Sequence, residues 1–331
     1  MTILLATSVV RGSQQGSSHG GIYLFDTNSN KRLQPVNWNS IDIDWQGRGW
    51  DRGLRGIAFL NNRIFIAASD EIFEFDLSFQ IVQSFKNPYL KHCHEICIYG
   101  QHLFITSTGF DCILGLNLET EQFDWGLQVL MEAGRFGCAR FDPRADHGPM
   151  RLNKLHINNV SCLEGGMYIS GLRTAALLRY DGRNIGIYST LPKGVHNARP
   201  FLNGLLFNDT NADALRHEAP DRSIAYRIPR YPDHKLTHKA MDGSSIARQA
   251  FGRGLCVISE GLVAGGSSPS TITIYDLDQE DPRLIVNFTM DVRSAIHGLE
   301  VWPHPWPEIN EKALRADLSK EKSSVVVPDV L

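Results

Sequence analysis

The sequence has no long apolar run and no cluster of basic residues. None of its apolar stretches approaches the roughly 20 residues that a membrane-spanning helix needs, so we expect no membrane partner. The formal net charge is −3 over 331 residues, and no run of Lys and Arg stands out. The electrostatic footprint of a nucleic-acid-binding protein is therefore missing. The apolar opening of the chain lacks a basic segment and a small-residue cleavage site, which predicts a strand rather than a signal peptide.

Cysteine pairs of the kind that bind metals or form small disulfide frameworks are also missing. The six cysteines are scattered and include no Cys-x-x-Cys pair: Cys93, Cys97, Cys112, Cys138, Cys162 and Cys256. In a chain of this length, such spacing indicates reduced and mostly buried thiols. We therefore expect a cytoplasmic protein.

Helical periodicity is scarce, whereas short segments with the alternating pattern of strands fill most of the chain. Several of these segments overlay one another without a gap. Each has an apolar residue nine positions after its first residue, and a two-residue turn signal such as Asn61-Asn62 comes before it. Five such units begin at Arg55, His94, Asn158, His196 and Arg253. A bare unit takes about 40 residues, which is near the repeat length of a β-propeller blade.

A sixth unit is split between the two ends of the chain. It combines residues 297–302 as an inner strand with three strands at residues 3–9, 21–26 and 31–38. Closing the ring in this way removes an exposed sheet edge. The sequence therefore predicts an all-β, six-bladed β-propeller, closed by pairing of N- and C-terminal strands in one blade. We expect one domain over residues 1–310 and a short helix and tail over 311–331.

Two intervals between blades carry extra residues. One insert covers about 131–155, before the third blade, and the other covers about 210–222 in the fourth blade, with more loop near 232–252. Both fall in loops of the face on which the inner strands begin. Long loops over a rigid scaffold often carry binding function, so we expect both inserts to cap that end of the channel.

The first residues of the six inner strands are strongly polar. They form a predicted ring of Arg55, His94, Asn158, His196, Arg253 and His297. Most histidines in a β-protein are structural or lie on the surface, but packing does not require the same titratable side chain at three equivalent blades. A concave pocket lined by such groups is the usual form of a ligand site.

Three of these imidazoles, from His94, His196 and His297, lie on alternate blades. Three-fold geometry of this kind suits a divalent metal such as zinc or iron, bound by three protein ligands with one position open. Such a metal polarises a carbonyl or lowers the pKa of its bound water. His156 precedes an inner strand by two residues and is a candidate fourth ligand or base.

The remaining ring residues suggest substrate binding. Arg55 and Arg253 are candidates to hold a carboxylate or phosphate through paired hydrogen bonds. Asn158 is a candidate to orient the ligand. Positive charges beside a metal repel it, so a metal-free site remains open, in which a histidine is the general acid–base and the arginines hold an anionic substrate. A third alternative is a non-catalytic propeller that binds a ligand or protein, because the fold alone does not fix function.

Several motifs resemble those of an uncharacterised family of bacterial six-bladed propellers that carries a domain of unknown function. Its H-x-H-D and C-H-L-N-G stretches resemble His92-Cys-His94-Glu95 and His156-Ile-Asn158-Asn, and its later motifs resemble the segments that begin at Thr106, His196 and Arg253. The resemblance spans about residues 55–300. It places seven residues on motif positions: His92, His94, His156, Asn158, His196, Arg199 and Arg253. Two positions depart from the family, because members often have an apolar residue in place of Arg55 and usually have Asp in place of Glu95.

The resemblance implies the propeller but no settled activity. Family members often lie near biosynthetic genes for peptides or glycans, so the resemblance favours an enzyme of natural-product biosynthesis. Taken together, these features predict a metal-assisted lyase, isomerase or hydrolase that acts on a small-molecule or peptide-like substrate. The sequence leaves the oligomeric state open.

Overall fold

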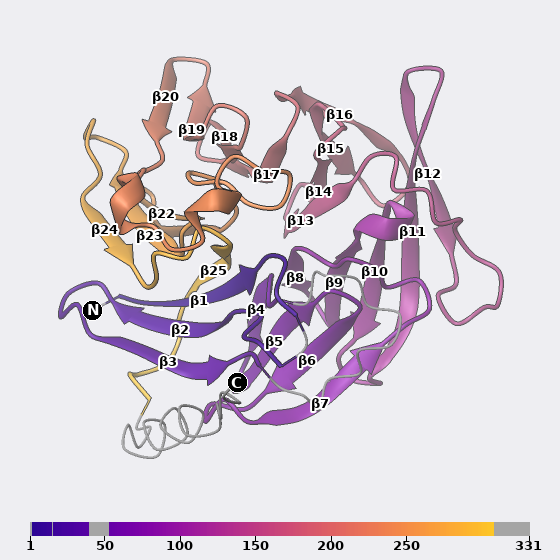
Figure 1. Cartoon of the computed structure of the whole chain (residues 1–331). Coiled ribbons are helices and arrows are strands. Elements are labelled where there is room, and N and C mark those ends of the chain that lie inside the picture. The colour runs from indigo at the N-terminus through magenta and orange to yellow at the C-terminus, as the bar shows by residue number, and fades with distance from the viewer. Residues whose placement is uncertain (1, 15, 40–52, 308–331) are drawn as a thin grey trace, which may run out of the picture.

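The computed structural model describes residues 2–14, 16–39 and 53–307. Within them the strands form six small antiparallel sheets, which are arranged around a central axis as the blades of a propeller (Figure 1). The predicted six-bladed β-propeller is confirmed. The predicted helix and tail at 311–331 lie outside the described residues.

In five of the six blades the strands are consecutive in the sequence and are ordered from the axis to the rim. The first three blades contain β4 (Ile57–Leu60), β5 (Arg63–Ala68), β6 (Glu71–Phe75) and β7 (Ile81–Lys86); β8 (Ile96–Tyr99), β9 (His102–Ser107), β10 (Cys112–Asn117), β11 (Gln122–Glu132) and β12 (Arg135–Phe141); and β13 (Ile157–Leu163), β14 (Gly166–Gly171), β15 (Ala176–Tyr180) and β16 (Ile185–Thr190). The fourth and fifth contain β17 (Val195–Phe201), β18 (Gly204–Asp209), β19 (Ala214–Ala219) and β20 (Arg222–Arg227); and β21 (Leu255–Ser259), β22 (Leu262–Ser267), β23 (Thr271–Asp276) and β24 (Leu284–Asn287).

The sixth blade joins the two ends of the chain, as the sequence predicts. Its order is β25 (Ser294–Val301), β1 (Ile3–Val10), β2 (Gly21–Asp26) and β3 (Arg32–Asn37). The buried hydroxyl of Thr7, on β1, donates a hydrogen bond to the carbonyl of Arg55 and accepts one from the backbone N–H of Gly298. A single side chain thus connects both strands of the closure to the first blade.

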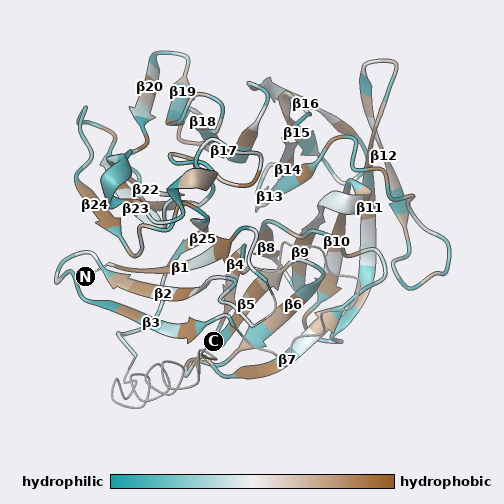
Figure 2. Ribbon diagram, in the orientation of Figure 1, coloured by the Kyte–Doolittle hydropathy of each residue, from teal (hydrophilic) through white to brown (hydrophobic). Residues whose placement is uncertain are grey.

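The core consists of six apolar clusters, and each lies between two neighbouring blades. A middle strand therefore packs on both of its faces. This explains why β2 is buried along its whole length, while the outer strand β7 is mostly exposed. Figure 2 shows apolar residues along the strands. The six clusters close the ring, since the last of them joins the sixth blade to the first.

The two inserts differ from the prediction. The first does not simply cap the channel, because residues 135–141 form β12, a fifth strand at the outer edge of the second blade. Only the end of this insert, at Asn153, reaches the channel. In the fourth blade, residues 214–219 form the ordinary third strand β19 rather than an insert. The extra chain of this blade lies between β20 and β21 and contains two short 3₁₀ helices, η2 (Asp233–Lys235) and η3 (Lys239–Met241).

Candidate functional site

A cavity of about 270 Å³ opens where the inner strands begin. Three arginines line it, namely Arg11, Arg55 and Arg253, together with four histidines, namely His92, His94, His156 and His297. Four of the six predicted ring residues are therefore at the cavity. The predicted convergence of histidines and arginines on one site is present, although its membership differs from the prediction.

The imidazole of His94 lies at the centre of the histidine group. Its ring centroid is 5.5 Å from that of His156 and 5.4 Å from that of His297. The Nδ1 atom is 2.8 Å from the carbonyl oxygen of His92. A carbonyl only accepts hydrogen bonds, so the neutral ring carries its proton on Nδ1 and leaves Nε2 as the basic nitrogen.

Thr108 supports this assignment. Its hydroxyl donates a hydrogen bond of 2.6 Å to the carbonyl of Ile157 and lies 2.9 Å from Nδ1 of His94. Since its one proton goes to Ile157, the hydroxyl accepts from the Nδ1–H of His94. Burial and the positive charge of Arg55 hold the pKa of His94 well below its usual value. The ring is therefore neutral at physiological pH.

His297 has the same proton arrangement for a different reason. Its Nε2 atom lies 3.4 Å from Nη1 of Arg253, and a guanidinium only donates hydrogen bonds. Nε2 is thus the acceptor, and Nδ1 carries the proton. The Nδ1 atom is buried and has no hydrogen-bond partner among the described residues. Burial and the charge of Arg253 keep the pKa of His297 well below its usual value.

The arginines concentrate positive charge at this cavity. Burial lowers the pKa of Arg11 and of Arg55 to about 10. Burial, followed by repulsion from Arg11 and Arg55, lowers the pKa of Arg253 well below its usual value. Among the described residues that line the cavity, none is an aspartate or a glutamate. The nearby carboxylate of Asp70 is already paired with Lys91 at 2.5 Å.

Aromatic stacking holds part of this charge in place. The guanidinium groups of Arg11, Arg248 and Arg253 all lie over the ring of Phe251, at 4.6, 4.7 and 4.3 Å from its centroid. Phe251 and Arg248 belong to the long loop between β20 and β21. This loop, rather than the segment at 210–222, is the part of the fourth blade that reaches the site. A stacked cation–π arrangement offsets a part of the repulsion between the arginines.

Asp111 fixes the approach to the third blade. Its carboxylate accepts hydrogen bonds from four consecutive backbone N–H groups, those of Lys154, Leu155, His156 and Ile157, at 2.5–3.4 Å. His156 has a left-handed backbone, with φ of 56°. This conformation is uncommon for a residue other than glycine and is held by the surrounding structure. Asp111 is therefore the positioning residue for His156.

Replacement of Asp111 by alanine is expected to lower the free energy of unfolding by about 2–4 kcal/mol, because it leaves several buried N–H groups without acceptors. Urea denaturation would measure the effect. Asp142→Ala is the matched control, because that carboxylate bonds only to Arg144 at the surface. If the two variants lose equally little stability, the carboxylate of Asp111 does not hold residues 154–157 in place.

Three predicted site residues lie away from the cavity lining. His196 is buried, and its ring centroid is 6.0 Å from that of Phe251. Asn158 donates a hydrogen bond of 3.3 Å to the carbonyl of Val195 and so joins the inner strands of two blades. Arg199 donates to the carbonyl of Leu255 at 3.1 Å. Of the three predicted metal ligands, His94 and His297 line the cavity and His196 does not, while His156 also lines it.

Arg199 belongs to a second polar group, formed with Glu95 and Glu300. Burial raises the pKa of Glu95 to about 8 and that of Glu300 to about 7, and the charge of Arg199 opposes both shifts. Asn197 donates a hydrogen bond of 2.9 Å to Glu95. Arg199 is thus the main positive charge that faces both carboxyl groups, whereas the described lining of the cavity includes no carboxyl group.

The predicted zinc or iron centre remains a prediction. Within residues 2–14, 16–39 and 53–307, no three or more His, Cys, Asp or Glu side chains are grouped so that they could hold a metal ion. The arrangement of the cavity itself points to other chemistry: it combines neutral imidazoles with several fixed positive charges.

Sequence reasoning missed Arg11 and Asp111. Arg11 directly follows β1, which is eight residues long and carries a register shift after Thr7. The available signal was the length of this second strand, which continues beyond the level at which the inner strand begins and so carries Arg11 to the cavity. Asp111 follows a short 3₁₀ helix, η1 (Thr108–Phe110), and has φ of 50°. A single Asp before a strand gives no sign that it will bind four N–H groups distant in sequence.

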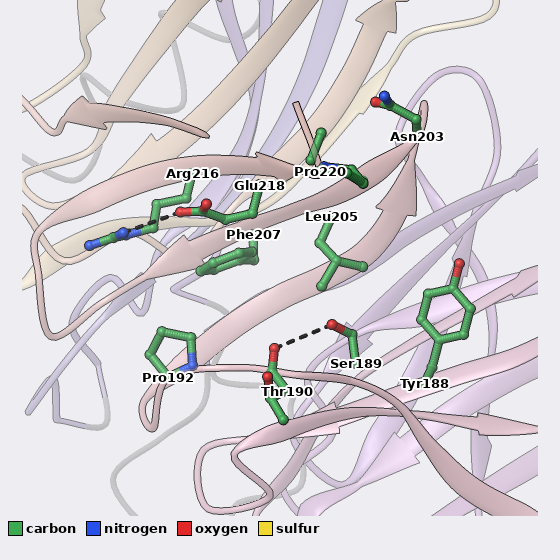
Figure 3. Close-up of a pocket in the computed structure, with 12 residues that line it drawn as sticks. Tyr188, Ser189, Thr190, Pro192, Asn203, Leu205, Phe207, Arg216, Glu218 and Pro220 are labelled. Carbon is green, nitrogen blue, oxygen red and sulfur yellow. Dashed lines mark hydrogen bonds and ion pairs between the residues drawn. The ribbon is translucent and has the colours of Figure 1, made fainter. Parts of the chain in front are cut away.

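Other hollows lie outside the channel. Figure 3 shows one of about 560 Å³, between Tyr188 and Ser189 on β16 and Leu205 and Phe207 on β18. Arg216 lies at its edge and pairs with Glu218 at 3.2 Å. This hollow contains no histidine and none of the predicted site residues. It therefore adds nothing to the histidine and arginine chemistry of the channel.

Comparison with known proteins supports the fold alone. No family model and no curated protein matches the sequence. Among solved structures with a similar fold is a chain of a nidogen/laminin complex. It has a TM-score of 0.54 and 11% sequence identity, and the match covers 91% of this chain and 97% of that one. Another is a protein of unknown function from Bacteroides caccae, with a TM-score of 0.54 and 10% identity over 92% and 99% of the two chains. The chain thus shares its overall fold with these two structures. Among the described residues, no helix is long and apolar enough to span a membrane.

Proposed function

We propose that the channel cavity binds a small anionic molecule, with a carboxylate or phosphate group, and that His94 moves a proton on it without a metal. The observation that carries this proposal is the convergence of Arg11, Arg55 and Arg253 on a cavity whose described lining includes no carboxylate. The guanidinium groups of Arg11, Arg248 and Arg253 stack on one ring and repel one another, and an anionic ligand relieves that repulsion.

The roles follow from the proton positions. The arginines hold the anionic group of the substrate. Nε2 of His94 is the basic nitrogen, and its orientation is fixed through Nδ1 by His92 and Thr108. A neutral imidazole next to a bound carboxylate is suited to removing a proton from the adjacent carbon, while the Nδ1–H of His297 is available as a donor. This favours a lyase or an isomerase within the classes that the sequence predicts.

The metal-assisted alternative is weaker because of the same arginines. A dication placed among His94, His156 and His297 would be repelled by Arg55 and Arg253, whose charges already lower the pKa of these imidazoles. Elemental analysis of protein purified from metal-replete medium separates the two. Trace metal supports the proposal, and one equivalent of zinc or iron per chain would favour the metal-assisted enzyme.

Anion binding is the first test. Inorganic phosphate and succinate are expected to raise the melting temperature of the wild-type protein. A ligand at ten times its Kd stabilises a protein by about 1.4 kcal/mol. Arg253→Gln is expected to abolish the shift, whereas Arg144→Gln, which changes an exposed arginine paired with Asp142, is expected to retain it. If both variants respond as the wild type does, the arginines of the cavity do not hold the anion.

Proton transfer is the second test. Small carboxylic acids incubated with the protein in D₂O are expected to gain deuterium at the carbon next to the carboxylate, as followed by NMR. His94→Gln is expected to retain phosphate binding and to lose this exchange. Binding without exchange across such a panel would instead support the non-catalytic ligand-binding propeller.

The wider setting is also a proposal. The six free cysteines suit a reducing compartment, so we place the protein in the cytoplasm. The motif resemblance to bacterial propellers of unknown function supports a role in natural-product biosynthesis. Proteomic fractionation of the source cells would test the location.

A further inference from the structure

Two cysteines from neighbouring blades face each other at close range. Cys97 lies on β8, the inner strand of the second blade, and Cys162 lies on β13, the inner strand of the third blade. Their Sγ atoms are 3.4 Å apart although the residues are 65 positions apart in the sequence. The two strands pack side by side, and both thiols are half-buried. Neither residue takes part in the proposed chemistry of the channel.

The other four cysteines have no such neighbour. Cys93, Cys112 and Cys256 are buried, and burial raises the pKa of each thiol. Cys138 is half-buried like the pair, but its Sγ atom donates to the carbonyl oxygen of Arg183, at 3.8 Å, rather than to a thiol. All six cysteines lie in the described part of the chain, so Cys97 and Cys162 form its one close pair of thiols.

We propose that Cys97 and Cys162 are a redox site, at which a peroxide converts the two thiols into a disulfide between the second and third blades. The Sγ atoms need to approach by about 1.4 Å to reach the disulfide bond length of about 2.05 Å. Side-chain rotation on two adjacent strands supplies a movement of this size. A peroxide molecule is small enough to reach half-buried thiols.

The hydrogen bond between the thiols sets the order of events. The S–H of Cys97 donates to Sγ of Cys162, and this bond, together with burial, raises the pKa of Cys97 well above its usual value. Cys97 therefore keeps its proton at the first step, and Cys162 is the sulfur that attacks the peroxide. It takes one oxygen from hydrogen peroxide to become a sulfenic acid, and the first water leaves. Cys97 then attacks this sulfur and loses its proton, and the second water leaves as the disulfide forms. Two thiols are oxidised by two electrons, and one peroxide is reduced to two waters.

The bridge would act on strands that begin beside the cavity. β8 starts two residues after His94, and β13 starts directly after His156. A covalent link between them fixes the separation of the two strands that carry these histidines. Reduction by a cellular dithiol would release it, so the site is a reversible modification rather than damage.

Peroxide treatment of the full-length protein tests the proposal. After treatment, blocking of remaining thiols and digestion without reductant, mass spectrometry is expected to detect a linked peptide that contains Cys97 and Cys162. The count of free thiols in the denatured protein is expected to fall from six to four and to return to six with a reductant. Diamide, which oxidises thiols directly to disulfides, is expected to give the same linked peptide.

Three variants complete the experiment. Cys97→Ser and Cys162→Ser are expected to give no reducible intramolecular bridge, whereas Cys138→Ser, the matched half-buried control, is expected to form the bridge as the wild type does. If neither oxidant produces the Cys97–Cys162 peptide from the folded wild-type protein, the proposal is wrong. Bridges to Cys138 at equal yield would also overturn it, since the 3.4 Å pairing would then confer no selectivity.

Discussion

The protein is expected to lose roughly 5 kcal/mol of stability between pH 6.5 and pH 4.5, a large part of the 5–15 kcal/mol that is typical of folded domains. The cause is four imidazoles held neutral in the native state. Burial and nearby arginines keep the pKa of His94, His196 and His297 well below the usual value. Burial, and then Arg253, lowers the pKa of His156 to about 3.

The direction follows from proton uptake in the two states. In the unfolded chain these histidines take up protons as the pH falls through about 6.5, while the folded protein does not. Their contribution is therefore complete above pH 6.5 and is lost as the pH falls towards their folded pKa values. Glu95 and Glu300 act in the opposite direction. Their pKa values, raised to about 8 and about 7, make the folded state bind protons that the unfolded state releases above about pH 4.5.

The two groups together predict a stability maximum near neutral pH. Above it the two glutamates ionise at a cost, and below it four histidines outweigh two glutamates by about two protons. Each net proton is worth about 2.7 kcal/mol over two pH units. Urea denaturation at a series of pH values measures this profile. His94→Gln is expected to flatten its acid side, whereas His147→Gln, at an exposed position, is expected to leave it unchanged. An acid side that is equally steep in His94→Gln would contradict the assignment.

Replacement of Arg253 by methionine is expected to stabilise the ligand-free protein by about 1–4 kcal/mol. Arg253 is half-buried, and its guanidinium is repelled by Arg11, Arg55 and Arg248. An apolar side chain of similar volume removes both the desolvation cost and the repulsion, as in other replacements of buried charges. The loss of stacking on Phe251 offsets about 0.5–1 kcal/mol. The same variant is expected to lose the stabilisation by phosphate. Its advantage in stability over the wild type therefore shrinks as phosphate is added.

Arg199→Met is the informative comparison, because replacing this arginine by methionine is expected to lower the stability of the protein rather than to raise it. Arg199 is the main positive charge that faces Glu95 and Glu300, so its removal raises the cost of ionising both carboxyl groups and destabilises the protein. Thermal unfolding at pH 8 without added anions compares the two. Equal destabilisation by both variants would mean that Arg253 has a structural partner, and that the cavity is not a site of excess positive charge.

The fold could be predicted from the sequence because the strand pattern of one blade is repeated along the chain. Five segments overlay without gaps, and each position of one blade is checked by the same position of the others. The split blade followed from the lone inner strand at His297. The segment at 210–222 was misjudged because β19 has the sequence Ala-Leu-Arg-His-Glu-Ala, which is polar for a third strand. Its pairing with β18 and β20 comes from position in the blade rather than from its own pattern.

The site was predictable only for residues whose side chains face the channel because they lie near the start of an inner strand. Arg55, His94 and Arg253 lie two residues before the inner strands β4, β8 and β21. His297 lies within β25, and all four reach the cavity. His156 also reaches it, but through a left-handed backbone and the carboxylate of Asp111 rather than through strand alternation. Arg11 enters from the end of a second strand. These contacts depend on backbone conformations that are set by distant residues, and no local pattern encodes them.

A crystal structure of the protein soaked with arsenate, an anomalously scattering analogue of phosphate, would show whether the channel cavity binds an anion. We expect an arsenic peak in the cavity, within hydrogen-bond distance of the guanidinium groups of Arg11 and Arg253, and loss of that peak in Arg253→Gln. A cavity that contains only water under these conditions, or a metal ion bound by His94, His156 and His297, would contradict the proposed function.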